Sequence, residues 1–463
     1  MTVNLTTTTL ASALCLIAIL SLIASPRVRT VSGFFHGVDD QGAAPGLWTL
    51  VLSQVTTWIF ARSLLNAALL GYAFGIAGAL GYTAFYLSFL TGGVIVDRIR
   101  FRRGHSSIQN FMREEYGAFG VATFNFLIAL RLVSEVFANL LVVGIIFGAT
   151  GSSNYYIAIA FVTLITLAYS LIGGLRASLR TDVVQMLLFI AVLVAVMAIL
   201  MFRPDFSVSA ALASSPQVNS PGWVLLAVAL LQVISYPMHD PVMMDRGWLA
   251  DRTTSWMSFI HAFWLSALCI LAFGMIGVYA GLHKMSGEAM MQTFERLFDW
   301  PTLMLINIAL LVSAMSTLDS ALASAAKLAI VDMKLGSENV RNGRIAMVAF
   351  TLAGILLLLT GSKDLYAAVA ISGTAAMFLT PVILFNLIGG WRAPLWSYQI
   401  AFALAITGAV IYFLDSSGYT KIVAALFGPL HNYTVLLVIN AAIFLFSCLA
   451  FAIGVARTNK PGA

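Results

Sequence analysis

Apolar runs of about twenty residues recur along nearly the whole chain, and no other feature constrains its fold as strongly. A helix rises about 1.5 Å per residue, so about 20 apolar residues cross a hydrocarbon core roughly 30 Å thick. Thirteen runs qualify, with approximate limits 8–25, 47–71, 75–97, 119–149, 154–172, 182–202, 221–245, 256–282, 301–330, 345–361, 365–389, 396–414 and 432–455. The sequence therefore predicts an all-α polytopic membrane protein with 13 transmembrane helices.

Charge and cysteine content exclude several other classes of protein. Only 10% of the residues are charged, whereas soluble domains carry about 25%. The net charge of +6 is spread over the loops, which argues against a nucleic-acid partner. Cys15, Cys269 and Cys448 lie inside apolar runs, so neither a disulfide framework nor a cysteine metal site is expected. No nucleotide-binding, zinc-protease or nucleophile motif occurs, so an enzyme is not expected.

Lysine and arginine residues predict how the spans are oriented. With the N-terminus outside, eighteen of these residues fall on the cytoplasmic side and five in outer loops. Loops rich in Lys and Arg stay in the cytoplasm. We therefore expect a multi-pass protein of the cell membrane (inner or plasma membrane) with its N-terminus outside and its C-terminus in the cytoplasm. Its partners would be the lipid bilayer and a small-molecule solute, and no obligatory protein partner is evident.

Two spans carry polar residues at mid-depth and enter the membrane from opposite sides. They are the second span, from Ser53, and the seventh, from Gln232. Transporters built from inverted repeats place interrupted helices in such a pair and bind solute where they break. Pro237 and Pro241 predict the break in the seventh span, whereas polar residues alone predict one in the second.

An ionisable side chain inside a membrane span costs free energy, so each one is expected to have a partner or a function. Arg131 and Glu135 lie one turn apart and could form a structural pair, or Arg131 could meet a solute. Arg62 has no partner nearby in sequence, and its partner would come from another helix, solute or water. We favour an Arg62 that faces a cavity.

The remaining polar groups also allow two interpretations. His239 and Asp240, between the two prolines, could bind solute or carry a proton, while Asp240 could also cap the second half-helix. Asp182 opens the sixth span and is expected to be a cap. Small hydroxylated residues recur through 313–324 (SAMSTLDSALAS) on one helical face. That face could pack closely against another helix or offer oxygen ligands to a hard cation such as sodium.

Four stretches together resemble the sodium:solute symporter family. They are TTWIFARSLLNAALLGYAFGIAGALGY (56–82), YSLIGGLRASLRTDVVQ (169–185), HDPVMMDRGWLADRT (239–253) and SAMSTLDSALASAAKLAIVDM (313–333). The last is similar to the signature in the family's eighth core helix, and the second to its Thr-Asp segment, with Arg180 where Trp is usual. The first stretch is closest to the urea-transporter branch.

The resemblance implies a LeuT-like core of two inverted repeats of five helices, with one helix before and two after. Residues 1–46 would form the N-terminal span and an inner loop, and 47–202 the first repeat. Residues 203–220 would form an outer loop and 221–389 the second repeat. Residues 390–463 would hold two further spans and a short cytoplasmic tail.

The resemblance also implies ion and solute sites. The ligands of a coupling Na+ would be the carbonyls of Thr56, Ile59 and Ser313 with the hydroxyls of Ser316 and Thr317. A possible second Na+ would use Asp182. Solute would lie against Arg62, Ser63, Asn66, Tyr82, Arg131, Tyr236, His239 and Asp240. Ser320 and Ser324 would serve packing, and Asp319 receives no firm role.

The function implied is sodium-coupled secondary active uptake of a small polar organic solute by alternating access. Two alternatives remain open at this point. One is a proton-coupled transporter of the same fold, with His239, Asp240 or Asp182 titrating. The other is a membrane module that senses solute without net transport. The identity of the solute does not follow from the sequence.

Overall fold

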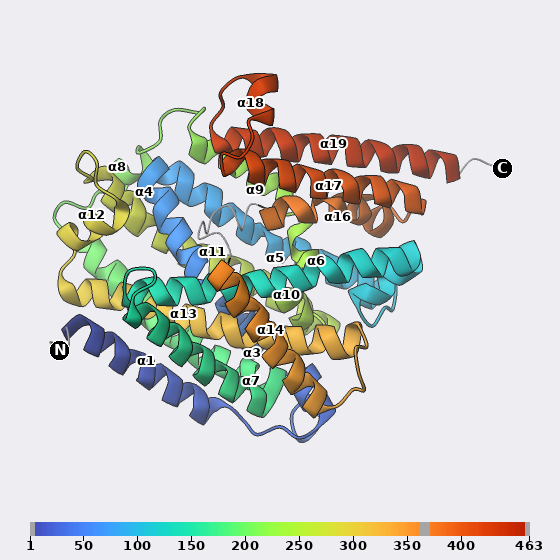
Figure 1. The fold of residues 1–463 in the computed structure, drawn as a ribbon, viewed down its shortest axis with the longest axis horizontal. Coiled ribbons are helices and arrows are strands. Elements are labelled where there is room, and N and C mark those ends of the chain that lie inside the picture. Colours follow the sequence, from blue (N-terminus) through green and yellow to red (C-terminus); the bar gives the residue numbers. More distant parts are fainter. Residues whose placement is uncertain (1–4, 361–370, 459–463) are drawn as a thin grey trace.

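The computed structural model describes residues 5–360 and 371–458, and these residues form helices with no strand among them (Figure 1). Helices satisfy their own backbone hydrogen bonds, which a segment in lipid requires because no water is present there. The prediction of an all-α polytopic membrane protein is confirmed.

The helices follow one another along the chain with short connections. The first part of the chain holds α1 (Leu5–Ala24), α2 (Val31–His36), α3 (Leu47–Trp58), α4 (Ala61–Thr83), η1 (Ala84–Leu87), α5 (Ser88–Val96), η2 (Asp97–Arg102), α6 (Ile108–Phe147) and α7 (Ser153–Met201). The middle part holds α8 (Val208–Leu212), α9 (Pro221–Gln232), η3 (Tyr236–His239), α10 (Pro241–Arg246), α11 (Arg252–Leu282), α12 (Met290–Leu297), α13 (Trp300–Lys327) and η4 (Leu328–Asp332). The last part holds α14 (Val340–Thr360), η5 (Ala376–Phe378), α16 (Leu379–Pro381), η6 (Val382–Ile388), α17 (Leu395–Ser416), α18 (Ile422–Phe427) and α19 (Asn432–Thr458).

The number of continuous spans differs from the predicted thirteen. Within the described residues, ten helices are long and apolar enough to cross a membrane. The fifth and sixth predicted spans both lie in α7. The elements α4, η1, α5 and η2 form one continuous helical stretch, Ala61–Arg102, which holds the end of the second predicted span and the whole of the third. The seventh is not continuous, because α9 has only 12 residues. Part of the predicted span 365–389 lies outside the described residues.

Glycine kinks explain why predicted neighbours merge into one helix. Gly75 in α4 has φ 61° and ψ −149°, and Gly174 in α7 has φ 56° and ψ −140°. A residue with a Cβ atom rarely adopts this region, whereas glycine enters it at little steric cost. Each glycine therefore bends the helix between two apolar runs, and no loop separates them. The sequence shows two apolar runs at these places, whereas the structure has one continuous, kinked helix.

The central helices are flanked on opposite sides by the first helix and the last two. α1 packs on α7 and α13, whereas α17 and α19 lie side by side and α19 contacts α9 (Figure 1). Between them, α13 packs on α7 and α6, and α4 packs on α11 and α9. The functional candidates lie in this central group, on α3, α4, α6, α7, α10 and α13.

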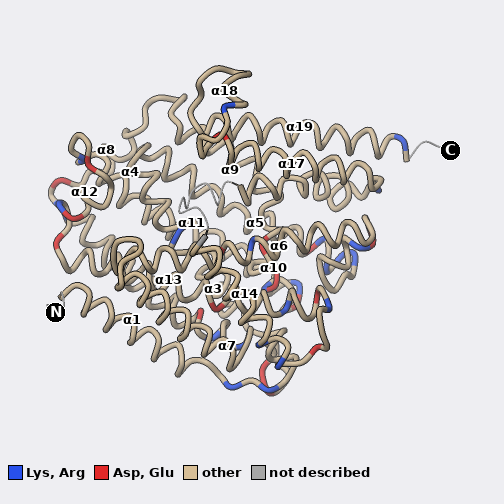
Figure 2. Tube along the Cα trace, in the orientation of Figure 1, with Lys and Arg blue, Asp and Glu red and all other residues tan. Residues whose placement is uncertain are grey.

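Basic residues are concentrated in the loops at one end of the molecule. Figure 2 shows Lys and Arg gathered to the right of α6 and α10 and along the lower edge. Arg98, Arg100, Arg102 and Arg103 all lie in or directly after η2. We call this the basic end, and the end that carries α8 and α12 the opposite end.

Candidate functional site

The first broken helix lies where the sequence predicts a break. α3 ends at Trp58, Ile59 and Phe60 are not helical, and α4 begins directly afterwards. Carbonyls in the last turn of a helix lack partners within it. Here the carbonyl of Ile59 accepts a hydrogen bond from Ser313 Oγ, and the carbonyl of Trp58 accepts one from Tyr86 OH at 2.8 Å. Side chains from α13 and η1 therefore support a break that contains neither proline nor glycine.

The second broken helix contains both predicted prolines. α9 ends at Gln232, and a regular α-helix resumes only at α10, whose first residue is Pro241. Pro237 lies in the short η3 helix between them. Asp240 is extended and its Oδ1 accepts a hydrogen bond from Met243 N at 3.0 Å. Asp240 thus caps α10, which is one of its two predicted roles.

The other carboxylate oxygen of Asp240 connects the two breaks. Oδ2 accepts hydrogen bonds from Trp58 Nε1 at 3.1 Å and from Arg131 Nη2 at 3.0 Å. Arg131 Nη1 also lies 3.5 Å from Glu135 Oε2, and all three charged side chains are buried. Arg131 therefore pairs with two acids, one on its own helix and one on the second broken helix.

A small cavity adjoins this connection between the breaks. Its volume is about 20 Å³, and its lining is mostly aromatic: Trp58, Phe60, Arg62, Ser63, Tyr82, Phe85, Tyr86 and Tyr236. A single water needs about 10–15 Å³ of such volume, so in this state the cavity is nearly closed. Four of the eight residues predicted to meet solute line it.

Arg62 is the cationic group of this small cavity. Its guanidinium lies 5.7 Å from the centroid of the Phe60 ring, and that of Arg131 lies 5.3 Å from the same centroid. Arg62 Nε has no hydrogen-bond partner in the structure and is buried. Arg62 lines the cavity and makes no ion pair with the described residues.

The other residues predicted to meet solute lie around the cavity rather than on its wall. His239 is buried, with Nδ1 2.5 Å from the carbonyl of Tyr236 and Nε2 3.0 Å from Ser372 Oγ. Both ring nitrogens are therefore engaged by protein. Asn66 is one turn beyond Arg62 on α4 and is buried. Arg131 lies over the ring of Phe60, and Asp240 accepts a hydrogen bond from Trp58. Both of these aromatic residues line the cavity.

Two of the predicted sodium ligands, Ile59 and Ser313, meet at the first break, and the others lie close by in sequence on α3 and α13. Ser313 Oγ bonds the carbonyl of Ile59, and the carbonyl of Ser313 accepts from Thr317 Oγ1 at 2.9 Å. Ser316 donates its hydroxyl to Asp182 Oδ1 at 2.8 Å. Thr56 is buried in the last turn of α3. The donor set consists of hydroxyl and carbonyl oxygens, which are the ligands that a hard cation takes.

Next to these residues lies a fully buried polar cluster built from four helices. Ser53 Oγ donates to Asp182 Oδ2 at 2.6 Å, so both oxygens of this carboxylate accept hydroxyl protons. Arg246 extends from α10 into the cluster, with Nη2 3.5 Å from Asp182 Oδ2. The same nitrogen donates to Ser320 Oγ at 2.8 Å. Asp182 lies inside α7 and caps no helix, so the expected role as a cap is wrong. Ser320 accepts from Arg246 and therefore does more than pack, which is also contrary to expectation.

Asp319 lies on the far side of this cluster and is held by hydroxyls alone. Its Oδ2 accepts from Thr181 Oγ1 at 2.7 Å, and its Oδ1 from Ser178 Oγ and Ser320 Oγ, both at 3.3 Å. Among the described residues no basic side chain forms an ion pair with it. The cluster thus holds two carboxyl groups and one guanidinium.

Arg246 is the main residue that sequence reasoning missed. It follows Asp245 at the end of an apolar run, and its sequence position predicts one more basic residue of a cytoplasmic loop. The structure places it at 0% exposure. A signal was available, because a membrane-buried acid such as Asp182 needs a partner, but the sequence does not say which arginine supplies it.

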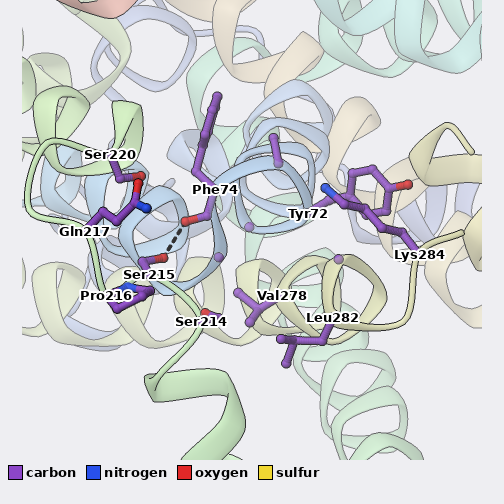
Figure 3. Close-up of a pocket in the computed structure, with 14 residues that line it drawn as sticks. Tyr72, Phe74, Ser214, Ser215, Pro216, Gln217, Ser220, Val278, Leu282 and Lys284 are labelled. Carbon is purple, nitrogen blue, oxygen red and sulfur yellow. Dashed lines mark hydrogen bonds between the residues drawn. The ribbon is translucent and has the colours of Figure 1, made fainter. Parts of the chain in front are cut away.

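Two larger cavities lie away from these residues. The first, of about 330 Å³, lies at the Gly75 kink near the opposite end and is lined by Lys284, Gln217 and serines of the segment before α9 (Figure 3). There Ser215 Oγ donates to the carbonyl of Phe74 at 2.5 Å. None of the predicted ion or solute residues lines this cavity.

The second large cavity, of about 820 Å³, opens at the basic end and includes Arg100, Arg113 and Lys327. A small space of about 20 Å³ shares Lys327 with it and reaches Met238 and Pro241 at the second break. Lys327 forms an ion pair with Asp245 and lies 3.7 Å from Asp332 Oδ2. This ion-pair group lies between the large cavity and the broken helix.

Comparison with known proteins finds one family profile that matches part of the chain. Residues 42–251 match the profile described as the sodium:solute symporter family. This range holds three of the four stretches that carry the resemblance, apart from the last two residues of the third. No curated protein matches the sequence.

Two solved structures share the fold. One is titled a substrate-bound outward-open state of a Na+-coupled sialic acid symporter that reveals a novel Na+ site. It has 17% identity and a TM-score of 0.75, and the match covers 98% of this chain and 97% of the other. The second is Mhp1, a nucleobase-cation-symport-1 family transporter, in a closed conformation with bromovinylhydantoin bound. It has 14% identity and a TM-score of 0.53, with coverage of 92% and 95%. The predicted fold class is confirmed, and the match over residues 42–251 agrees with the predicted resemblance to the sodium:solute symporter family.

Proposed function

We propose that this chain, whose residues 42–251 match the sodium:solute symporter family, uses a sodium gradient to take up a small polar organic solute. It would act by alternating access in the cell membrane. The basic end would face the cytoplasm, with the N-terminus outside and the C-terminus inside. The repeats would span 47–202 and 221–389, since the first helix of each is the broken one.

The observation that carries the proposal is the short non-helical segment Ile59–Phe60. The carbonyl of Ile59 meets Ser313, on the ion side of the break. The ring of Phe60 lines the small cavity and lies against Arg62 and Arg131. An ion that binds the carbonyl of Ile59 would fix this segment and thereby the wall of the solute cavity. Both ligands would then bias the same element, which is what coupling requires.

Formal charges around the site support a cation as the coupling ion. With both acids ionised, Asp182, Asp319 and Arg246 together carry one excess negative charge in a fully buried cluster. Ser316, a proposed ligand, donates directly to Asp182. A monovalent cation at the proposed ligands would offset that charge at close range, where the low dielectric makes the interaction strong.

Formal charges around the cavity support a solute without net charge. Arg62 and Arg131 are matched by Glu135 and Asp240, and all four side chains are buried. An anion would disturb this balance. A neutral molecule with hydrogen-bonding groups would instead use the free Nε of Arg62 and the hydroxyls of Ser63 and Tyr82.

Sodium binding can be tested before the solute is known. We expect the purified protein to unfold at a higher temperature in sodium chloride than in potassium or choline chloride at equal ionic strength, because a ligand of the native state stabilises it. At a sodium concentration of about one hundred times Kd the gain is about 2.7 kcal/mol. Small neutral amides and ureas are then screened for a further rise that requires sodium. Equal unfolding temperatures in all three salts would count against sodium as coupling ion, and a rise with falling pH in sodium-free buffer would favour protons.

A further inference from the structure

The cluster around Asp182 does not fit a second sodium ion, because a side chain already supplies a cation there. Arg246 Nη2 donates to Ser178 Oγ at 3.2 Å and to Ser320 Oγ at 2.8 Å. Its Nε donates to Ser53 Oγ at 3.2 Å. The guanidinium is thus enclosed by hydroxyl oxygens from α3, α7 and α13, with the Asp182 carboxylate beside it.

These are the oxygens that a cation at Asp182 would need as ligands. A sodium ion takes its ligands from carboxylate, hydroxyl and carbonyl oxygens. The hydroxyls of Ser53, Ser178 and Ser320 each accept a hydrogen bond from Arg246, and Asp182 Oδ2 lies 3.5 Å from the same guanidinium. A sodium ion here would lie against the guanidinium in a site that excludes water, where like charges repel strongly.

We infer that Arg246 is a built-in cation that takes the place of a second sodium ion at Asp182, so that the chain binds one sodium ion only. This inference rests on the proposed function and makes it more specific. An arginine is suited to the role because it stays charged when buried and offers several donors in a fixed plane. Since Arg246 ends α10, it also ties the second broken helix to α7 and α13.

Equilibrium binding of radioactive sodium to the purified protein in lipid nanodiscs tests this inference. We expect close to one ion per wild-type protein and a Hill coefficient near one, since the coefficient cannot exceed the number of sites. Arg246→Gln removes the charge and leaves Asp182 available, so in this variant we expect the number of bound sodium ions per protein to approach two. In Arg246→Lys, which keeps a cation on α10, we expect it to stay near one.

The possible outcomes separate the inference from the proposed function. Two ions per wild-type protein would overturn the inference while leaving sodium coupling intact. One ion in both the wild type and a folded Arg246→Gln would overturn the role of Arg246. No sodium bound by the wild type would overturn both. If Arg246→Gln does not fold, the wild type and Arg246→Lys decide: two sodium ions per protein in either one would overturn the inference.

Discussion

Replacing Ser316 and Thr317 together by alanine is expected to weaken sodium binding about ten- to hundredfold. Each hydroxyl donates its single proton to a fixed acceptor, Ser316 to Asp182 and Thr317 to the carbonyl of Ser313. The lone pairs that remain on each oxygen are then free for an ion. Losing polar contacts to a charge costs about 1.5–3 kcal/mol, which corresponds to the stated range. Sodium titration of the unfolding temperature measures the change.

Ser324→Ala is the matched control for this double substitution. Ser324 lies on the same helix and is buried, and its hydroxyl has no hydrogen-bond partner in the structure. The control protein should bind sodium like the wild type. A double variant whose sodium dependence is also unchanged would show that the ion binds elsewhere.

Arg131→Ala is expected to destabilise the protein by about 3–5 kcal/mol. The substitution leaves Glu135 and Asp240 buried without their shared cation, and removing one partner of a buried ion pair costs about this much. It also removes one of the two donors to Asp240 Oδ2 and thus loosens the connection between the breaks. Denaturant unfolding of the purified protein measures the change in the free energy of unfolding.

An exposed arginine on the same helix provides the comparison for Arg131. Arg113 lies near the start of α6 and is exposed. Arg113→Ala should change the free energy of unfolding by no more than about 0.5 kcal/mol. In the triple variant Arg131→Met, Glu135→Gln and Asp240→Asn, much of the lost stability should return, because the acids are no longer uncompensated. Equal stability of the Arg131 and Arg113 variants would mean that the buried pairing is unimportant.

Much of the site could be predicted because its parts have local signals. Apolar runs predict spans, and Pro237 and Pro241 predict the second break, since proline lacks the donor that a helix needs. Hydroxyl spacing on α13 predicts that Ser313, Ser316 and Thr317 share a face. The structure brings that face to the carbonyl of Ile59, where the resemblance implies an ion.

The remainder could not be predicted because it depends on which helices meet. Arg131 has an obvious partner in Glu135 one turn away, and only the fold reveals the second partner, Asp240, 109 positions along the chain. Arg246 looks like one more basic residue of a cytoplasmic loop until α10 is packed against α7 and α13. Gly75 and Gly174 bend helices without ending them, so neighbouring predicted spans form one continuous helix among the described residues, and the predicted number of thirteen is not confirmed.

Uptake by sealed proteoliposomes tests the central claim most directly. The protein is reconstituted in one set of vesicles, and the solute found by thermal screening is supplied outside. An inward sodium gradient should drive its accumulation above the outside concentration, and a sodium ionophore that dissipates the gradient should abolish accumulation. Accumulation that is unaffected by the sodium gradient, or that follows an inward proton gradient in sodium-free buffer, would contradict sodium-coupled transport.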